Sequence, residues 1–158
     1  MDFGTLFRLE ENLNLDKKTL VFLRWIAIFG QLFSVNLVYF FLDLNFPVLL
    51  CHIIIFIGLV TNVFLQFGLK ATLLKDLYSS SFLMYDIIQL SILLFLTGGI
   101  FNPFAILLIV PTIVSSTFLS MGSTIILGTS TIFLLFVLTF FKMPLPGMEE
   151  YVLSFPNY

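Results

Sequence analysis

The stretch Gly98–Phe104, which reads Gly-Gly-Ile-Phe-Asn-Pro-Phe, holds the residue types most typical of a ligand site in this sequence. Its two adjacent glycines allow backbone conformations that other residues disfavour, and they let another molecule approach the main chain. Asn102 and Pro103 suit the cap and the first turn of a following helix. Because the rings of Phe101 and Phe104 add flat apolar faces, the stretch predicts a niche for a flat, lipophilic molecule with carbonyl oxygens, such as a quinone. The alternative interpretation is an ordinary corner between two helices.

Three titratable side chains fall in apolar surroundings, where polar groups are costly and need partners or a task. Arg24 and Asp86 are expected at similar depth near the inner interface, where they could pair across two helices. The alternative is that both side chains extend separately to water. His52 is expected in the outer half of its helix, either as a hydrogen-bonded packing residue or as a proton-accepting neighbour of a ligand. No spacing of residues predicts a catalytic or metal site.

The composition indicates which kind of element must position these residues. Hydrophobic residues make up 59 % of the 158 residues and charged residues 10 %, whereas soluble domains are about 45–50 % apolar and about 25 % charged. The net charge is −2 and the mean hydropathy is +1.12. A soluble domain, a disordered chain and a nucleic-acid-binding protein are therefore excluded, and the single cysteine, Cys51, excludes a disulfide framework. The fold class that follows is all-α, a polytopic integral membrane helical bundle.

Apolar runs of about 20 residues, the length that crosses a bilayer, predict five spans. The uncharged stretch 104–141 is too long for one crossing, so it must turn back near Ser120–Ser123. Residues 1–20 are expected to form a cytoplasmic lead-in, and residues 142–158 an outer loop that stops before a sixth span. The predicted spans are 21–41, 46–67, 82–98, 104–120 and 122–141.

The basic residues predict the orientation, because Lys and Arg accumulate on the cytoplasmic side of membrane proteins. With the N-terminus in the cytoplasm, six of the seven basic residues lie inside and only Lys142 lies outside. This orientation places Gly98–Phe104 at the outer face of the bundle.

The run Leu96–Phe104 resembles the Gly-Gly-x-x-Asn-Pro-Phe signature of the RegB/PrrB/ActS family of redox-sensing histidine kinases. The similarity covers roughly residues 18–147. Other pieces match the family in the same order: Leu23-Arg24-Trp25 and Gly30-Gln31, Asp86-Ile87-Ile88-Gln89-Leu90, Pro111 with Ser115 and Thr117, and Pro144-Leu145-Pro146.

The resemblance implies a six-span sensor domain that binds ubiquinone as its signal ligand. In the family, the redox state of the quinone pool controls histidine autophosphorylation in a cytoplasmic kinase domain and phosphotransfer to a response regulator. A homodimer in the bacterial cytoplasmic (inner) membrane is implied as well. Phe101 occupies a variable position of the signature and is added here for its ring. The quinone-site residues that the signature nominates are Gly98, Gly99, Asn102, Pro103 and Phe104.

The sequence also departs from the family. His52 lies within a span and cannot be the phosphoacceptor, Cys51 does not match the family's redox cysteine, and no ATP-binding domain is present. The 158 residues are therefore expected to be the sensory portion of a partial kinase, inactive as a kinase alone. Two other functions stay open: a small membrane transporter component, which would need a polar path across the bilayer, and a structural membrane subunit with no ligand.

Overall fold

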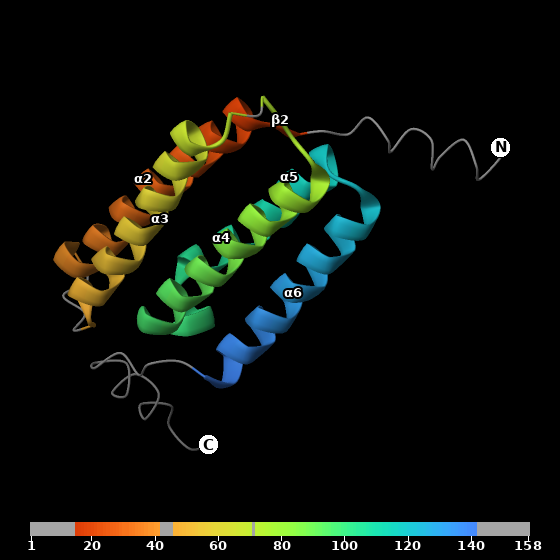
Figure 1. Ribbon diagram of the computed structural model, residues 1–158. Coiled ribbons are helices and arrows are strands. Elements are labelled where there is room, and N and C mark those ends of the chain that lie inside the picture. Colours follow the sequence, from red (N-terminus) through yellow and green to blue (C-terminus); the bar gives the residue numbers. More distant parts are fainter. Residues whose placement is uncertain (1–14, 42–45, 71, 142–158) are drawn as a thin grey trace, which may run out of the picture.

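The computed structural model describes residues 15–41, 46–70 and 72–141, which form two groups of helices (Figure 1). Helices α2 (Lys17–Phe41) and α3 (Val48–Gly68) make a hairpin. Helices α4 (Asp76–Leu96), α5 (Val110–Phe118) and α6 (Met121–Phe140) make the second group. Helix α3 also packs against α4, so the two groups form one bundle. The all-α fold class is confirmed.

A small ladder closes one end of the α2–α3 hairpin. Strand β1 (Leu15–Asp16) pairs antiparallel with β2 (Leu73–Leu74). The Lys17 ammonium donates to the carbonyl oxygens of Gln66, at 3.1 Å, and Leu69, at 2.6 Å. A cation is favourable at the C-terminal end of a helix, where carbonyl groups lack partners. Lys17 therefore ties the start of α2 to the end of α3.

Two short 3-10 helices connect α4 to α5, namely η2 (Gly99–Phe101) and η3 (Pro103–Ile109). The single α-helical span predicted for 104–120 is therefore wrong in its first half. Proline lacks the backbone N–H that an α-helix needs, so Pro111 cannot donate to the Leu107 carbonyl one turn earlier. The regular α-helix begins only at Val110.

The predicted reversal near Ser120–Ser123 is confirmed, because α5 ends at Phe118 and α6 begins at Met121. The Ser120 hydroxyl caps α6 by accepting from the Ser123 N–H. The Asp76 carboxylate accepts from the Ser120 N–H at 2.8 Å, from the Ser120 hydroxyl at 2.9 Å and from the Ser123 hydroxyl. The first turn of α4 is thereby fixed to the turn between α5 and α6.

Four helices are long and apolar enough to cross a membrane, namely α2, α3, α4 and α6, whereas Pro103–Phe118 is shorter. The predicted count of five spans is therefore not confirmed. The third helix starts at Asp76 rather than at residue 82, because the hydroxyls of Ser80 and Ser81 bond to carbonyl oxygens of their own helix. The first helix likewise starts at Lys17 rather than at residue 21. Residues 1–14 and 142–158, which hold most of the predicted lead-in and outer loop, lie outside the described residues.

The interior of the bundle is aliphatic and many aromatic rings lie outside it. The larger buried cluster includes Ile87, Leu94, Leu108 and Leu127, which join α4 to η3 and α6. Exposed phenylalanines lie on α2, α3 and α6, and they include Phe22, Phe29, Phe33, Phe56, Phe64, Phe133 and Phe136. An outer surface of this kind is suited to lipid, since it would be unfavourable in water.

Candidate functional site

The glycine loop, defined here as residues 97–104, depends on its two glycines. Gly98 has a φ of 105° and Gly99 a φ of 65°. A left-handed backbone costs other L-residues about 1–2 kcal/mol. The expectation that this loop needs conformations disfavoured by other residues agrees with these angles.

The Asn102 side chain holds the glycine loop together. Its Oδ1 accepts from the Phe104 N–H at 2.9 Å, which caps η3 as predicted, and Pro103 follows in the first turn. Its Nδ2 donates to the Thr97 carbonyl at 3.2 Å and to the Thr97 hydroxyl at 2.8 Å. An amide nitrogen carries two hydrogens, so both donors of Asn102 are used within the loop. Asn102 is 8 % exposed, and its carboxamide serves the fold directly.

The outward surface of the glycine loop is apolar. Ile100 is 40 % exposed and Phe101 62 % exposed, while the Phe104 side chain is half-buried. Behind the loop lies a hollow of about 30 Å³, which has room for about two water molecules. This loop hollow is far smaller than a quinone ring. Its lining residues are Gln31, Ser34, Val35, Val38, Leu90, Leu93, Leu94, Thr97, Asn102, Phe104 and Leu107.

His52 and Cys51 lie on α3, away from the hollow behind the glycine loop. His52 Nδ1 lies 2.9 Å from the Val48 carbonyl oxygen, one turn earlier in the same helix. Cys51 is buried in an aliphatic cluster with Ile28 and Ile55. Neither residue lines the loop hollow. The structure therefore gives His52 the contact of a packing residue and does not bring it to the nominated quinone residues.

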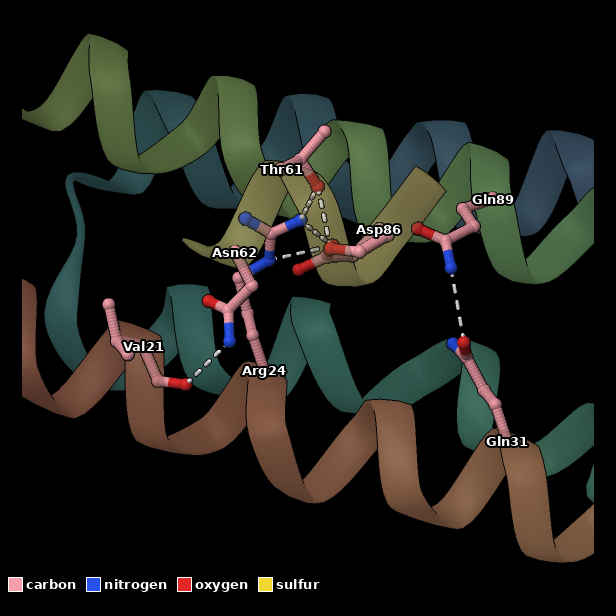
Figure 2. Close-up of polar contacts among 8 residues, drawn as sticks. Val21, Arg24, Gln31, Thr61, Asn62, Asp86 and Gln89 are labelled. Carbon is pink, nitrogen blue, oxygen red and sulfur yellow. Dashed lines mark hydrogen bonds and ion pairs between the residues drawn. The ribbon is translucent and has the colours of Figure 1, made fainter. Parts of the chain in front are cut away.

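The structure brings Arg24 and Asp86 together across α2 and α4 (Figure 2). Arg24 Nε and Nη2 each lie 3.0 Å from Asp86 Oδ1, and Nη2 also donates to the Thr61 hydroxyl of α3 at 3.0 Å. The guanidinium carbon lies 5.3 Å from the Phe82 ring centre, within the range of a cation–π contact. Of the two interpretations that the sequence left open, the structure has the pair, and it joins both groups of helices.

A second polar link crosses the bundle two turns farther along α2. Gln89 Nε2 of α4 donates to Gln31 Oε1 of α2 at 3.1 Å (Figure 2). Gly58 of α3 makes room for this link, since a Cβ there would lie 2.4 Å from Gln89 Nε2. A methyl group at Gly58 would therefore displace the Gln89 amide at the interface between α3 and α4.

An interhelical cavity of about 280 Å³ separates α2 from α4, η3 and α5. Its walls are almost entirely apolar, apart from Arg24, Asp86 and Gln31. It shares Gln31, Leu90 and Leu107 with the loop hollow, so the two spaces lie along the same gap between the helix groups. The residues that define it are Leu20, Leu23, Arg24, Ile26, Ala27, Gly30, Gln31, Leu83, Asp86, Leu90, Leu107, Val110, Pro111 and Val114.

Sequence reasoning missed this cavity and the part that Gln31 plays in it. Gln31 follows Arg24 by seven residues, a spacing that places both on one face of α2. That spacing was a usable signal for a shared polar face. Thr61 was also missed, and its hydroxyl carries no sequence pattern that would have pointed to Arg24.

These features define a polytopic helical membrane protein with a capped glycine loop and an ion pair between its helix groups. No protein-family model and no solved structure matches the chain.

The chain is 36 % identical over 141 residues to the protein named Sensor histidine kinase RegB from Cereibacter sphaeroides. The match covers 89 % of this chain and 30 % of that protein, so the chain spans less than a third of its curated relative. The resemblance predicted from the sequence is confirmed: the chain is related to part of a RegB-type sensor histidine kinase. Together with the four long apolar helices, this relationship supports a multi-pass protein of the inner membrane.

Proposed function

We propose that the chain is the sensory part of a redox-responsive two-component histidine kinase and that it senses the quinone pool through the glycine loop. The observation that carries the kinase class is the match to Sensor histidine kinase RegB over 89 % of this chain. As in the family it resembles, its state would control autophosphorylation of a kinase domain and phosphotransfer to a response regulator, within a homodimer.

The loop geometry supports a quinone site that is built from main chain and rings. The glycines Gly98 and Gly99 leave the backbone bare of side chains, and the exposed Phe101 ring lies next to them. The Asn102 side chain makes its three hydrogen bonds within the loop. In this proposal Asn102 and Pro103 position the loop, while Phe101 and Phe104 contact the ubiquinone ring.

A five-span topology with a cytoplasmic N-terminus is part of the proposal. The segment Pro103–Phe118 contains seven residues in η3 and nine in α5. Since a 3-10 helix rises about 2.0 Å per residue and an α-helix about 1.5 Å, the segment extends about 28 Å. That length approaches the hydrocarbon thickness of about 30 Å. The glycine loop would then face the outer side.

The signal would pass from the loop through η3 and α5. Quinone offers two acceptors, whereas quinol also donates, and a ligand shifts two states only through such a difference in affinity. About 1.4 kcal/mol, within the range of one hydrogen bond, shifts the equilibrium tenfold. Because η3 begins at Pro103, its tilt or rotation is coupled directly to what the loop binds.

The test is the affinity of a short-chain ubiquinone for the chain in detergent micelles. Replacing Phe101 with Ala should weaken binding about three- to tenfold, the range that an aromatic contact supplies. Replacing Asn102 with Ala should weaken it at least as much, because the loop loses its cap. The matched control is Phe133→Ala on the exposed side of α6. Unchanged affinity in both loop variants would remove the quinone role from the loop.

One observation favours a structural subunit without a ligand as the second candidate. The polar groups of Asn102 and Thr97 satisfy one another, and the hollow behind them holds only about two waters. A ligand-free corner has just these properties. Ubiquinone binding to the unaltered chain that is no stronger than its partition into empty micelles would favour this candidate.

A further inference from the structure

The interhelical cavity has the position of a site that is reached from the bilayer. It lies between the α2–α3 hairpin and the α4–α5–α6 group, and its walls come from α2 on one side and from α4, η3 and α5 on the other. Two of its wall residues, Ile26 on α2 and Val110 on α5, are 54 % and 46 % exposed on the apolar surface. A molecule dissolved in the lipid phase therefore meets the mouth of the cavity directly.

The polar groups of this cavity keep spare hydrogen-bonding capacity. Asp86 uses Oδ1 for Arg24, and among the residues that the structure describes its Oδ2 has no hydrogen bond. Gln31 uses Oε1 for Gln89, and within the same residues its Nε2 has none. Arg24 Nη1 is buried and lacks a partner in the described part of the chain. Polar atoms in apolar surroundings are costly when they stay unpaired, so the cavity favours an occupant that pairs with them.

The spacing of these groups indicates the shape of the occupant. Arg24 and Gln31 lie seven residues apart on α2, about 10 Å along its axis, and Asp86 is paired with Arg24. An acceptor thus stands at one end of an apolar cavity and an amide donor at the other. A volume of about 280 Å³ is close to the lower end of the range for small-molecule sites, about 300–1,000 Å³.

We propose that the interhelical cavity binds an uncharged, lipid-soluble molecule of about one substituted ring, with a hydroxyl at one end and an acceptor oxygen at the other. The hydroxyl donates to Asp86 Oδ2 and the acceptor oxygen receives a hydrogen bond from Gln31 Nε2. The Arg24–Asp86 pair is neutral as a whole, so it favours a neutral ligand over an ion. This site adjoins the hollow behind the glycine loop, with which it shares Gln31, Leu90 and Leu107, but it contains no residue of the loop and does not depend on the function proposed for the loop.

Gly30 offers a way to close the cavity without disturbing the fold. It lines the cavity, and a Cβ built on it meets nothing within 4 Å. Gly30→Leu therefore fills the open space, and it also removes a glycine from the middle of a helix, where glycine is unfavourable. Gly122→Leu is the matched control, because Gly122 is an exposed helical glycine outside the cavity.

The experiment measures binding of octyl para-hydroxybenzoate to the full chain in phosphatidylcholine nanodiscs. The signal is the fluorescence of Trp25, the single tryptophan, which neighbours Arg24. We expect the same affinity for the unaltered chain and Gly122→Leu, and about tenfold weaker binding for Gly30→Leu and Gln31→Leu. The methoxy analogue, which lacks the hydroxyl donor, should bind the unaltered chain about tenfold more weakly, as one hydrogen bond to a charged group implies.

Two results would overturn the proposal. Equal affinity of the unaltered chain and Gly30→Leu would show that the ligand does not occupy the cavity. Equal affinity for the hydroxy and methoxy compounds would reduce the cavity to an unspecific apolar space. If the first of these results came together with a loss of ubiquinone binding in Phe101→Ala, this inference would fail and the loop proposal would stand.

Discussion

The glycine loop and the interhelical cavity each contain a carboxamide side chain, but they differ in how many of its hydrogen bonds are made and in how much open space lies beside it. In the loop, the carboxamide of Asn102 makes three hydrogen bonds to Thr97 and Phe104, and the hollow behind it measures about 30 Å³. In the cavity, the carboxamide of Gln31 makes one, and the open space measures about 280 Å³. The loop is internally saturated, whereas the cavity has both room and spare polar atoms.

This difference shows that a sequence motif can specify a backbone conformation without specifying the space for a ligand. The Gly-Gly-x-x-Asn-Pro-Phe run specifies a backbone path, since it needs two left-handed residues and a cap. Space for a ligand depends instead on how far apart two helices pack, and distant residues such as Arg24 and Asp86, which join α2 to α4, contribute to that distance. A conspicuous motif therefore does not by itself mark where the bundle has room for a ligand.

The largest expected effect comes from breaking the ion pair beside the cavity. Arg24→Met leaves Asp86 buried without its cation, and removal of one partner of a buried pair costs about 3–5 kcal/mol. The free energy of unfolding, measured by titration with denaturing detergent in mixed micelles, should fall by that order. The double variant Arg24→Asp with Asp86→Arg should recover part of the loss.

Lys18→Met controls for the loss of a positive charge, because Lys18 is exposed at the start of α2. An Arg24→Met chain as stable as Lys18→Met would mean that the two side chains reach water separately. A double reversal no better than the single Asp86→Arg change would lead to the same conclusion.

The next effect concerns the packing that places Gln89 against Gln31. In Gly58→Ala, the new methyl group would lie 2.4–2.9 Å from the Gln89 amide, which is buried and bonded to Gln31. The amide is the end of a flexible side chain and must shift to make room for the methyl group. Because the shift draws the buried amide away from Gln31, we expect a cost of about 1–3 kcal/mol, the range for a buried polar group that loses its partner. Gly30→Ala is the control, since its methyl group meets open space. Equal unfolding midpoints for the two variants in the same detergent titration would contradict this account.

A substitution in the glycine loop should destabilise the protein through backbone strain rather than through a steric clash between side chains. Gly98→Ala forces alanine to a φ of 105°, and the expected cost is about 1–2 kcal/mol. Gly122→Ala, a substitution at an exposed helical position, should be neutral or stabilising. Hydrogen exchange of the amides in η2 and η3 would locate the damage. Unchanged exchange in Gly98→Ala would indicate that the loop does not require its left-handed residues.

Much of this architecture was predictable, because apolar length and turn residues act locally. The runs that became α3 and α6 were placed within about two residues, and the reversal at Ser120 followed from local turn chemistry. The start of α4 was missed, since Ser80 and Ser81 satisfy their hydroxyls within the helix. The change from 3-10 to α geometry lies next to Pro111, eight residues after η3 begins, and a hydropathy pattern does not report it.

The candidate site was predictable only where it depends on neighbours in sequence. The cap made by Asn102 follows from the Asn-Pro pair. The matching depth of Arg24 and Asp86 allowed either a pair or two side chains that reach water separately, and the structure shows the pair. The cavity depends on the lateral separation of α2 and α5, and the periodicity of hydrophobic residues in the sequence does not predict that separation. Of its polar lining, Arg24 and Asp86 were visible from their depth, and Gln31 only from its seven-residue spacing from Arg24.

The smallest effect tests whether the loop is truly saturated. Thr97 donates to the Leu93 carbonyl of its own helix at 2.8 Å and accepts from Asn102 Nδ2, so Thr97→Val removes both contacts at similar volume. Thr139 makes the same type of bond to the Leu135 carbonyl but lies exposed on α6. Thr97→Val should therefore be about 1 kcal/mol less stable than Thr139→Val, because only the first leaves a buried amide hydrogen without its acceptor. The comparison uses the midpoint of the same detergent titration. If the two variants unfold together, Asn102 finds another acceptor within the loop, and the contrast between a saturated loop and an open cavity loses its sharpest support.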